Sequence, residues 1–79
     1  MDTLVRPLAV GDRAKVVGYM PGDRHLRSRL LEMGLTPATE FTVMRVAPLG
    51  DPIEIRLRGF SLSLRKAETA ALKLERLAP

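Results

Sequence analysis

Apolar and charged residues alternate along much of the chain with the period of a β-strand. Ile53, Ile55 and Leu57 are each followed by a charged residue, so one face of that stretch is apolar and the other is charged. A valine-rich stretch and two shorter alternating runs favour strands as well. The pattern predicts five short strands, at residues 14–19, 40–47, 53–58 and 61–64 and around Leu72 and Leu74.

One stretch has the period of a helix instead. Asp23 is a good N-cap because its carboxylate can accept hydrogen bonds from the free amides of a first helical turn. Gly34 allows the left-handed backbone that ends many helices. Between them, Leu26, Leu30 and Met33 fall on one stripe. We therefore predict a helix from Asp23 to about Met33, with this stripe facing the core.

The connections are short and rich in turn residues. Residues 48–52, PLGDP, form a turn with proline at both ends, Gly59 favours a tight reversal, and residues 66–71 can form one short helical turn. Five short strands with such connections predict a small, mainly β barrel, whose closure would remove exposed sheet edges. Leu4 and Leu8, in the irregular first segment, are expected to pack against it.

The composition fits one small domain, which we expect to span residues 1–79. Apolar residues make up 46% of the chain, which favours a folded core over disorder. There is no cysteine, no signal-peptide pattern and no apolar run near the ~20 residues that span a bilayer. We therefore expect a cytoplasmic protein that reaches a membrane only through an embedded partner, without direct membrane insertion.

The net charge of +4, from 13 lysines and arginines against 9 acidic residues, favours an anionic partner. The sequence of residues 11–23, GDRAKVVGYMPGD, with its glycine, basic residues and valines, is similar to sequences in small barrels that bind ribosomal RNA. However, the chain has only one tyrosine and two phenylalanines on which bases could stack. In addition, Glu54 shares the strand face of Arg56 and Arg58. Nucleic acid is therefore the less favoured partner.

Residues 26–68, LRSRLLEMGLTPATEFTVMRVAPLGDPIEIRLRGFSLSLRKAE, closely resemble the ferrous-iron transport protein A (FeoA) family. The shared pattern is an arginine-containing helix before Gly34, a proline turn, the motif APLGDP, an alternating strand, and a leucine–arginine pair at 64–65 before a short helix. The resemblance extends over about residues 8–75. One departure is Ala38, where the family usually has glycine, so a less tight turn is expected there.

The resemblance implies an SH3-like five-stranded barrel with the helix inserted after the first strand. It also implies a cytosolic accessory of bacterial ferrous-iron uptake, peripheral to the inner membrane. Such a protein would dock on a FeoB-type membrane permease, through the permease's cytosolic GTP-binding domain, and modulate it. Two alternatives stay open: a small basic barrel that binds ribosomal-type RNA, and a metal-responsive SH3-like domain. A homodimer also stays open, because edge strands can pair between copies.

No set of residues is typical of catalysis, so we expect no enzymatic activity. His25 is the only histidine, no cysteine exists, and the glycines do not form a phosphate-binding loop. His25 with Asp23 and Glu32 is a weak candidate for a metal site, because a ferrous site needs more ligands than this partial set. We expect no intrinsic cofactor and at most an opportunistic zinc or ferrous ion at His25.

The flank of the predicted helix is the first candidate for binding a partner. Arg24 and Arg27 lie in the first turns, where the helix dipole slightly disfavours cations, and Leu31 lies beside them, off the core-facing stripe. An apolar anchor ringed by arginines is a common composition at protein interfaces. The second candidate is the PLGDP turn, with Leu49 and Asp51. For both surfaces, a purely structural role is the alternative.

Overall fold

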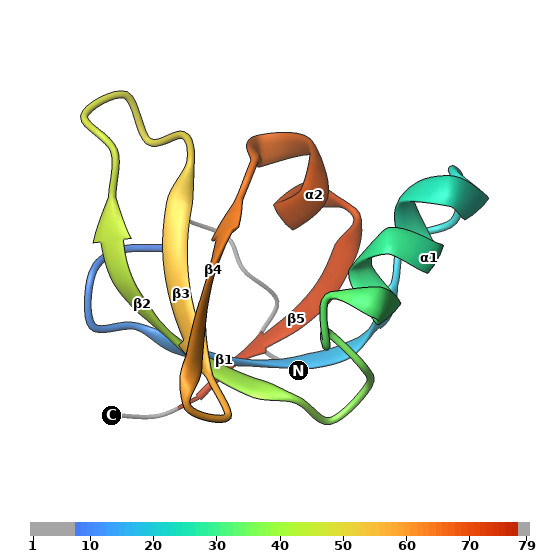
Figure 1. Cartoon of the computed structure of the whole chain (residues 1–79), viewed down its shortest axis with the longest axis horizontal. Helices are drawn as coiled ribbons and strands as arrows, with labels where there is room; N and C mark the ends of the chain where they lie inside the picture. Colours follow the sequence, from blue (N-terminus) through green and yellow to red (C-terminus); the bar gives the residue numbers. More distant parts are fainter. Residues whose placement is uncertain (1–7, 78–79) are drawn as a thin grey trace.

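The computed structural model describes residues 8–77. One antiparallel sheet of five strands curls into a small barrel, accompanied by two short helices (Figure 1). The ends of these elements differ from the predicted ones by one or two residues. Neither helix in this part of the chain is long and apolar enough to cross a membrane. In chain order the elements are β1 (Arg13–Tyr19), α1 (Arg24–Glu32), β2 (Glu40–Val46), β3 (Ile53–Leu57), β4 (Phe60–Leu64), α2 (Lys66–Ala70) and β5 (Leu72–Arg76).

The strands lie in the order β4-β3-β2-β1-β5. Strand β1 pairs on both sides, so that Ala14 lies opposite Phe41 in β2 and opposite Arg76 in β5. The expectation that the barrel closes is wrong. Within residues 8–77, β4 and β5 are the outer strands of the sheet and no ladder joins them. The short helix α2 links these two outer strands along the chain (Figure 1).

Two β-bulges accompany the curl of the sheet. The register shifts around Val17, where β1 pairs with β5, and around Met44, where β2 pairs with β3. A bulge bends its strand and increases the local twist, so these two positions account for part of the curvature. Val17 and Met44 are both exposed, as alternation with the buried residues before them predicts. Arg45, which follows Met44, is exposed as well, so the alternation along β2 is interrupted after the bulge.

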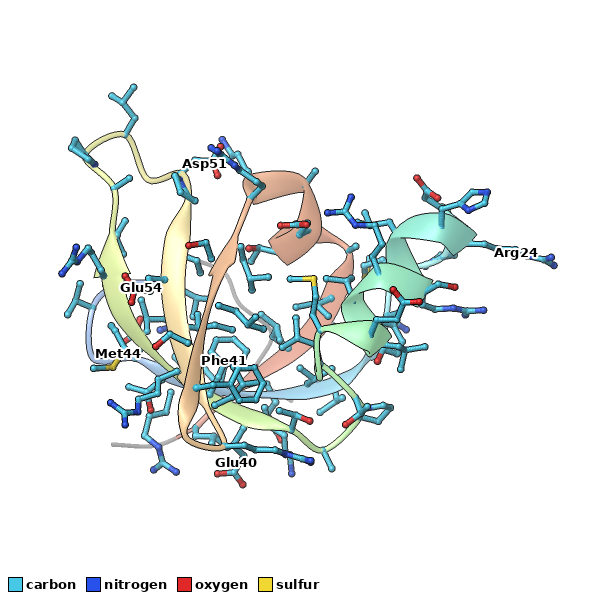
Figure 2. The ribbon with its side chains drawn as sticks, in the orientation of Figure 1. Arg24, Glu40, Phe41, Met44, Asp51 and Glu54 are labelled. Carbon is cyan, nitrogen blue, oxygen red and sulfur yellow. The ribbon has the colours of Figure 1, made fainter. Side chains whose placement is uncertain are left out.

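The core takes side chains from every strand and from α1. Leu30 is fully buried, with Leu26 and Met33 half-buried beside it, which confirms the predicted stripe. Phe41 points into the barrel (Figure 2). The prediction for Leu8 is confirmed, whereas Leu4 lies outside the described residues. The buried apolar residues are Leu8, Ala14, Val16, Leu30, Leu35, Phe41, Val43, Ile53, Ile55, Leu57, Leu64, Leu72 and Leu74.

The turn before β2 closes despite the alanine at position 38. The N–H of Thr39 donates to the carbonyl of Thr36 at 3.1 Å, and the N–H of Ala38 donates to the carbonyl of Val16 at 2.7 Å. Ala38 has a φ of 75°, in the left-handed region that glycine accepts and other residues avoid. The turn therefore forms with alanine in place, and Ala38 carries backbone strain. That it is less tight than a turn with glycine stays a prediction.

The β3–β4 turn removes one arginine from the charged face of β3. Arg58 and Gly59 have φ values of 48° and 84°, and together they make a two-residue turn of the type that favours hairpins. Arg58 therefore belongs to the turn and not to the strand. Only Glu54 and Arg56 remain on the outer face of β3, opposite the buried residues that alternate with them.

Candidate docking surface

The first turn of α1 is capped by Asp23, as predicted. Its Oδ1 accepts the N–H of His25 at 2.9 Å and that of Leu26 at 3.1 Å. This carboxylate oxygen therefore serves the helix. In residues 8–77, no three or more His, Cys, Asp and Glu side chains are grouped so that they could hold a metal ion. The structure thus does not bring Asp23, His25 and Glu32 together as a metal centre.

The other end of α1 fixes how the helix is rotated against the barrel. The N–H of Leu35 donates to the carbonyl of Leu30, and the N–H of Gly34 to that of Leu31, both at 3.0 Å. With Gly34 at a φ of 96°, this is the Schellman arrangement, in which apolar residues on either side of the glycine pack together. Leu30 and Leu35 are both buried here. Leu31, next to Leu30, therefore points away from the core.

The three predicted docking residues on α1 are all exposed. Leu31 is 41% exposed and is one of several large apolar side chains that the fold leaves at the surface. Arg24 points away from the barrel (Figure 2), and neither Arg24 nor Arg27 takes part in an ion pair in the part of the chain that the structure describes. We call Arg24, Arg27 and Leu31 the α1 outer face.

A groove of about 310 Å³ lies beside this face, between α1, the end of β1 and α2. Met20 and Leu26 give it apolar walls, and Arg27 belongs to both the groove and the α1 outer face. The prediction from sequence missed the groove because α2 is too short to show a periodic pattern. On the α2 side the lining consists of the small side chains of Ala67, Ala70 and Ala71.

Tyr19 also lines the groove, and its hydroxyl donates to the carbonyl of Leu35. Burial raises the pKa of the Tyr19 phenol, and the positive charge of Arg27 acts in the opposite direction. Tyr19 and Arg27 both line the groove. The groove thus combines apolar walls with one positive residue, Arg27, and one negative residue, Asp23, which caps α1.

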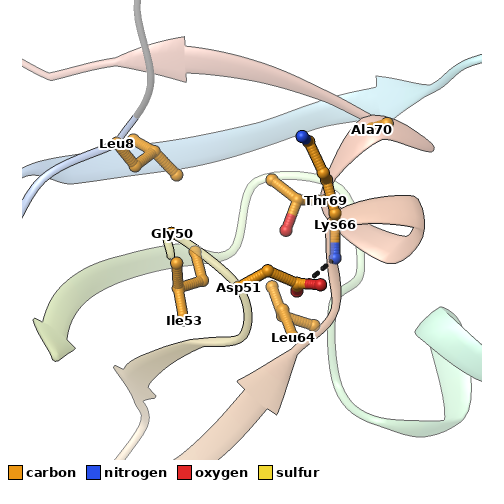
Figure 3. A pocket seen from close by; sticks show the side chains of 8 residues that line it. All are labelled: Leu8, Gly50, Asp51, Ile53, Leu64, Lys66, Thr69 and Ala70. Carbon is orange, nitrogen blue, oxygen red and sulfur yellow. Dashed lines mark hydrogen bonds between the residues drawn. The ribbon is translucent and has the colours of Figure 1, made fainter. Parts of the chain in front are cut away.

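The second predicted surface, the β2–β3 turn, lies on the other side of the barrel from α1 (Figure 1). Leu49 at this turn is 95% exposed. Asp51, in contrast, is engaged within the chain, because its Oδ1 accepts the N–H of Lys66 at 2.8 Å (Figure 3). The turn and α1 therefore do not form one continuous surface. A pocket of about 290 Å³ next to the turn has an apolar lining that includes Leu8, Ile53 and Leu64.

The outer face of β3 carries mixed charge. Arg56 is exposed there, but Glu54 lies two residues away on the same face. The carboxylate of Glu54 lies 4.0 Å from the guanidinium of Arg45 on the neighbouring strand. A uniformly basic strip of the kind that tracks a phosphate backbone is not present on this strand pair.

Known proteins similar to this chain agree with the family resemblance. The chain is 37% identical, over 68 residues, to the Fe(2+) transport protein A/Fe(2+) transporter FeoB fusion protein of Porphyromonas gingivalis. That alignment covers 86% of this chain but only 8% of the length of the fusion protein. The solution structure of a FeoA-like protein from Clostridium acetobutylicum is 39% identical, with a TM-score of 0.81, and the match covers 91% of this chain and 83% of that one.

The fold also matches that of a more distant protein. FeoA of Stenotrophomonas maltophilia, a prokaryotic SH3 domain protein solved with zinc, is 22% identical with a TM-score of 0.70, and the match covers 99% of this chain and all of that one. The predicted SH3-like fold is thereby confirmed. A family model described as the FeoA domain matches residues 4–76. The chain therefore belongs to the FeoA domain family.

Proposed function

We propose that this protein is an accessory of bacterial ferrous-iron uptake that docks on the cytosolic GTP-binding domain of a FeoB-type permease. Membership of the FeoA family supports the iron-uptake role. The Porphyromonas gingivalis relative contains both a transport protein A part and a FeoB transporter in one chain. Where the two are separate chains, a docking contact would take the place of that covalent link.

The α1 outer face is the observation that carries this proposal. Arg24 and Arg27 have no ion pair within residues 8–77, so docking would not have to break one. Leu31 offers apolar area between them, and the groove beside it offers more. Arginines around an apolar anchor form strong contacts when a partner removes water from them. The complementary surface on the permease would be acidic at its edge and apolar at its centre.

Docking can modulate the permease only through a difference in affinity between two of its states. If the protein binds one nucleotide state of the GTP-binding domain tenfold more tightly, it shifts the balance between the states by about 1.4 kcal/mol. The protein itself then needs no catalytic step and no resident cofactor. Any zinc or ferrous ion at His25 would be opportunistic.

This function places the protein in the cytoplasm, peripheral to the inner membrane through its partner and without membrane insertion of its own. Nucleic acid is not the partner in this proposal. The mixed charge of the β3 outer face, where Glu54 lies beside Arg56, supports that choice. That residues 1–79 form one domain stays a prediction.

The experiment is co-purification of the tagged protein with the intact permease in detergent, with an excess of ribosomal RNA as competitor. We expect the permease to be retained and the RNA not to displace it. Failure to retain the permease would contradict the proposal. Retention of RNA with a steep loss of binding as salt rises would favour the RNA-binding alternative instead.

A further inference from the structure

The outer strand β4 lacks the charge, the proline and the bulge that often protect a sheet edge, and its first residue, Phe60, lies close to Gly34 at the end of α1. The β4 sequence, FSLSL, contains no charge and no proline, and its pairing with β3 shows no bulge. The other outer strand, β5, carries Lys73, Glu75 and Arg76. Phe60, the first residue of β4, is 44% exposed. Figure 1 shows β4 at the front of the barrel, paired with β3 on one side.

The backbone groups on the free side of β4 belong to two serines. Because the β3–β4 turn has two residues, Leu57 and Phe60 form a hydrogen-bonded pair, and such pairs alternate along a hairpin. Leu62 therefore also bonds to β3, and the N–H and C=O groups of Ser61 and Ser63 point away from it. Beyond the strand ladders, no backbone hydrogen bond among residues 8–77 involves either serine, and both are exposed.

We propose that β4 pairs with β4 of a second copy of this chain, antiparallel and across a two-fold axis at Leu62. In this register Ser61 of each copy faces Ser63 of the other, so each free N–H meets a free C=O. Phe60 of each copy lies opposite Leu64 of the other. Leu64 is already buried in its own core, so the apolar area that pairing covers is that of Phe60. Residues 60–64 alternate apolar, polar, apolar, polar, apolar, and this order is the same from either end. Two antiparallel copies therefore place apolar residues opposite apolar residues and serines opposite serines.

The charges on β3 favour this register, with the Glu54 carboxylate also lying 4.0 Å from Arg45 on β2. Arg56 pairs with Ser61, and Glu54 pairs with Ser63, on the outer face of the sheet. In the register centred on Leu62, the paired residues form two rows that cross the dimer at right angles to the strands. Each row contains Arg56 of one copy, Ser61 of that copy, Ser63 of the other copy and Glu54 of the other copy. A shift by two residues in one direction would instead set Arg56 against Arg56, and in the other direction Glu54 against Glu54. Only the centred register therefore gives opposite charges in both rows.

Amide exchange tests the pairing on the unmodified protein. The protein is measured at concentrations from about 10 μM to about 1 mM, a range in which weak dimers form. As the concentration rises, the average mass from analytical ultracentrifugation should increase, and the Ser61 and Ser63 amides should become more protected from exchange. The amide of Leu62, which already bonds to β3, should not change. A protein that stays monomeric at the highest concentration would overturn the proposal. So would a dimer in which the two serine amides exchange as fast as in the monomer.

Ser63→Pro removes one free N–H at each end of the interface and should weaken the dimer by more than tenfold. Ser63→Ala keeps the N–H and is the matched control, with an expected change of less than twofold. Arg56→Glu leaves β4 intact but makes both rows repulsive, and it should weaken the dimer severalfold even if the proline variant fails to fold. Unchanged association of Arg56→Glu, or of a folded Ser63→Pro variant, would overturn the proposal. The test involves no permease, so it is independent of docking through α1.

Discussion

Arg29 of α1 and Glu68 of α2 form an ion pair, with 3.2 Å between Nη2 and Oε2. Glu68 is buried, and its other oxygen, Oε1, accepts the N–H of Arg65 at the start of α2 at 2.8 Å. One carboxylate therefore caps α2 and also holds α1 against it. The groove beside the α1 outer face lies between the same two helices. The ion pair thus helps to set the shape of the proposed docking region.

Glu68→Ala should lower the free energy of unfolding by about 1–3 kcal/mol, because it removes both the cap and the ion pair. Arg29→Ala should cost less than about 1 kcal/mol, since the arginine side chain is largely exposed and the pair is screened by solvent. Urea unfolding of both variants and of the double variant measures this. If the Glu68→Ala variant has the same urea concentration at the midpoint of unfolding as the wild type, the role assigned to this carboxylate is wrong.

Adjacent leucines on α1 should respond in opposite ways. Leu30→Ala should destabilise the protein by ~2–5 kcal/mol because Leu30 is fully buried. Leu31→Ala should change stability by less than ~0.5 kcal/mol, as is usual for an exposed site. Thermal melting followed by circular dichroism compares the two. Equal melting temperatures for the two variants would show that the rotation of α1 described here is incorrect.

The position of α1 could be predicted because its signals are local. Asp23 and Gly34 mark its ends, and Leu26, Leu30 and Met33 mark its buried stripe, all within a few turns of one helix. The strands were predictable for the same reason, since alternation needs only neighbouring residues.

What the sequence could not predict depends on residues far apart in the chain. Arg29 and Glu68 are separated by 39 positions, and nothing in either segment indicates that they meet. The bulges at Val17 and Met44 depend on how two strands align, and alternation within one strand does not contain that information. The open sheet edge at β4 is likewise a property of the strand order. The ion pair bears on the groove beside the α1 outer face, and the open edge bears on the proposed pairing of β4.

Ala38→Gly should stabilise the protein by about 0.5–1 kcal/mol, because glycine relieves the left-handed strain but adds freedom to the unfolded chain. The matched control is Ala67→Gly in α2, where the backbone is helical. That change should destabilise the protein by about 1 kcal/mol. Chemical denaturation gives both values. Destabilisation by Ala38→Gly would contradict the strain assigned to this turn.

Zinc added to the protein should bind only weakly and through His25. Calorimetric titration of His25→Ala should show no binding at that site, and Glu32→Gln should behave as wild type, because the structure does not group these residues into a metal centre. Tight one-to-one binding that is lost in Glu32→Gln would show that the residues assemble around the ion after all.

The central claim is that the α1 outer face docks on the permease. The variant that tests it replaces Arg24, Arg27 and Leu31 by alanine. A matched control replaces two arginines and one apolar residue on strands β2 and β3 by alanine: Arg45, Arg56 and Met44. Met44 is 46% exposed, similar to Leu31. Circular dichroism first confirms that both triple variants are folded.

The decisive measurement is the affinity of wild type, α1 variant and control variant for the intact permease at one fixed salt concentration. The α1 variant should bind more than tenfold more weakly, a loss of at least about 1.4 kcal/mol, as expected for an interface that loses its central anchor. The control variant should bind as wild type does. Equal affinity of the α1 variant and wild type would contradict the account and direct attention to Leu49 on the β2–β3 turn.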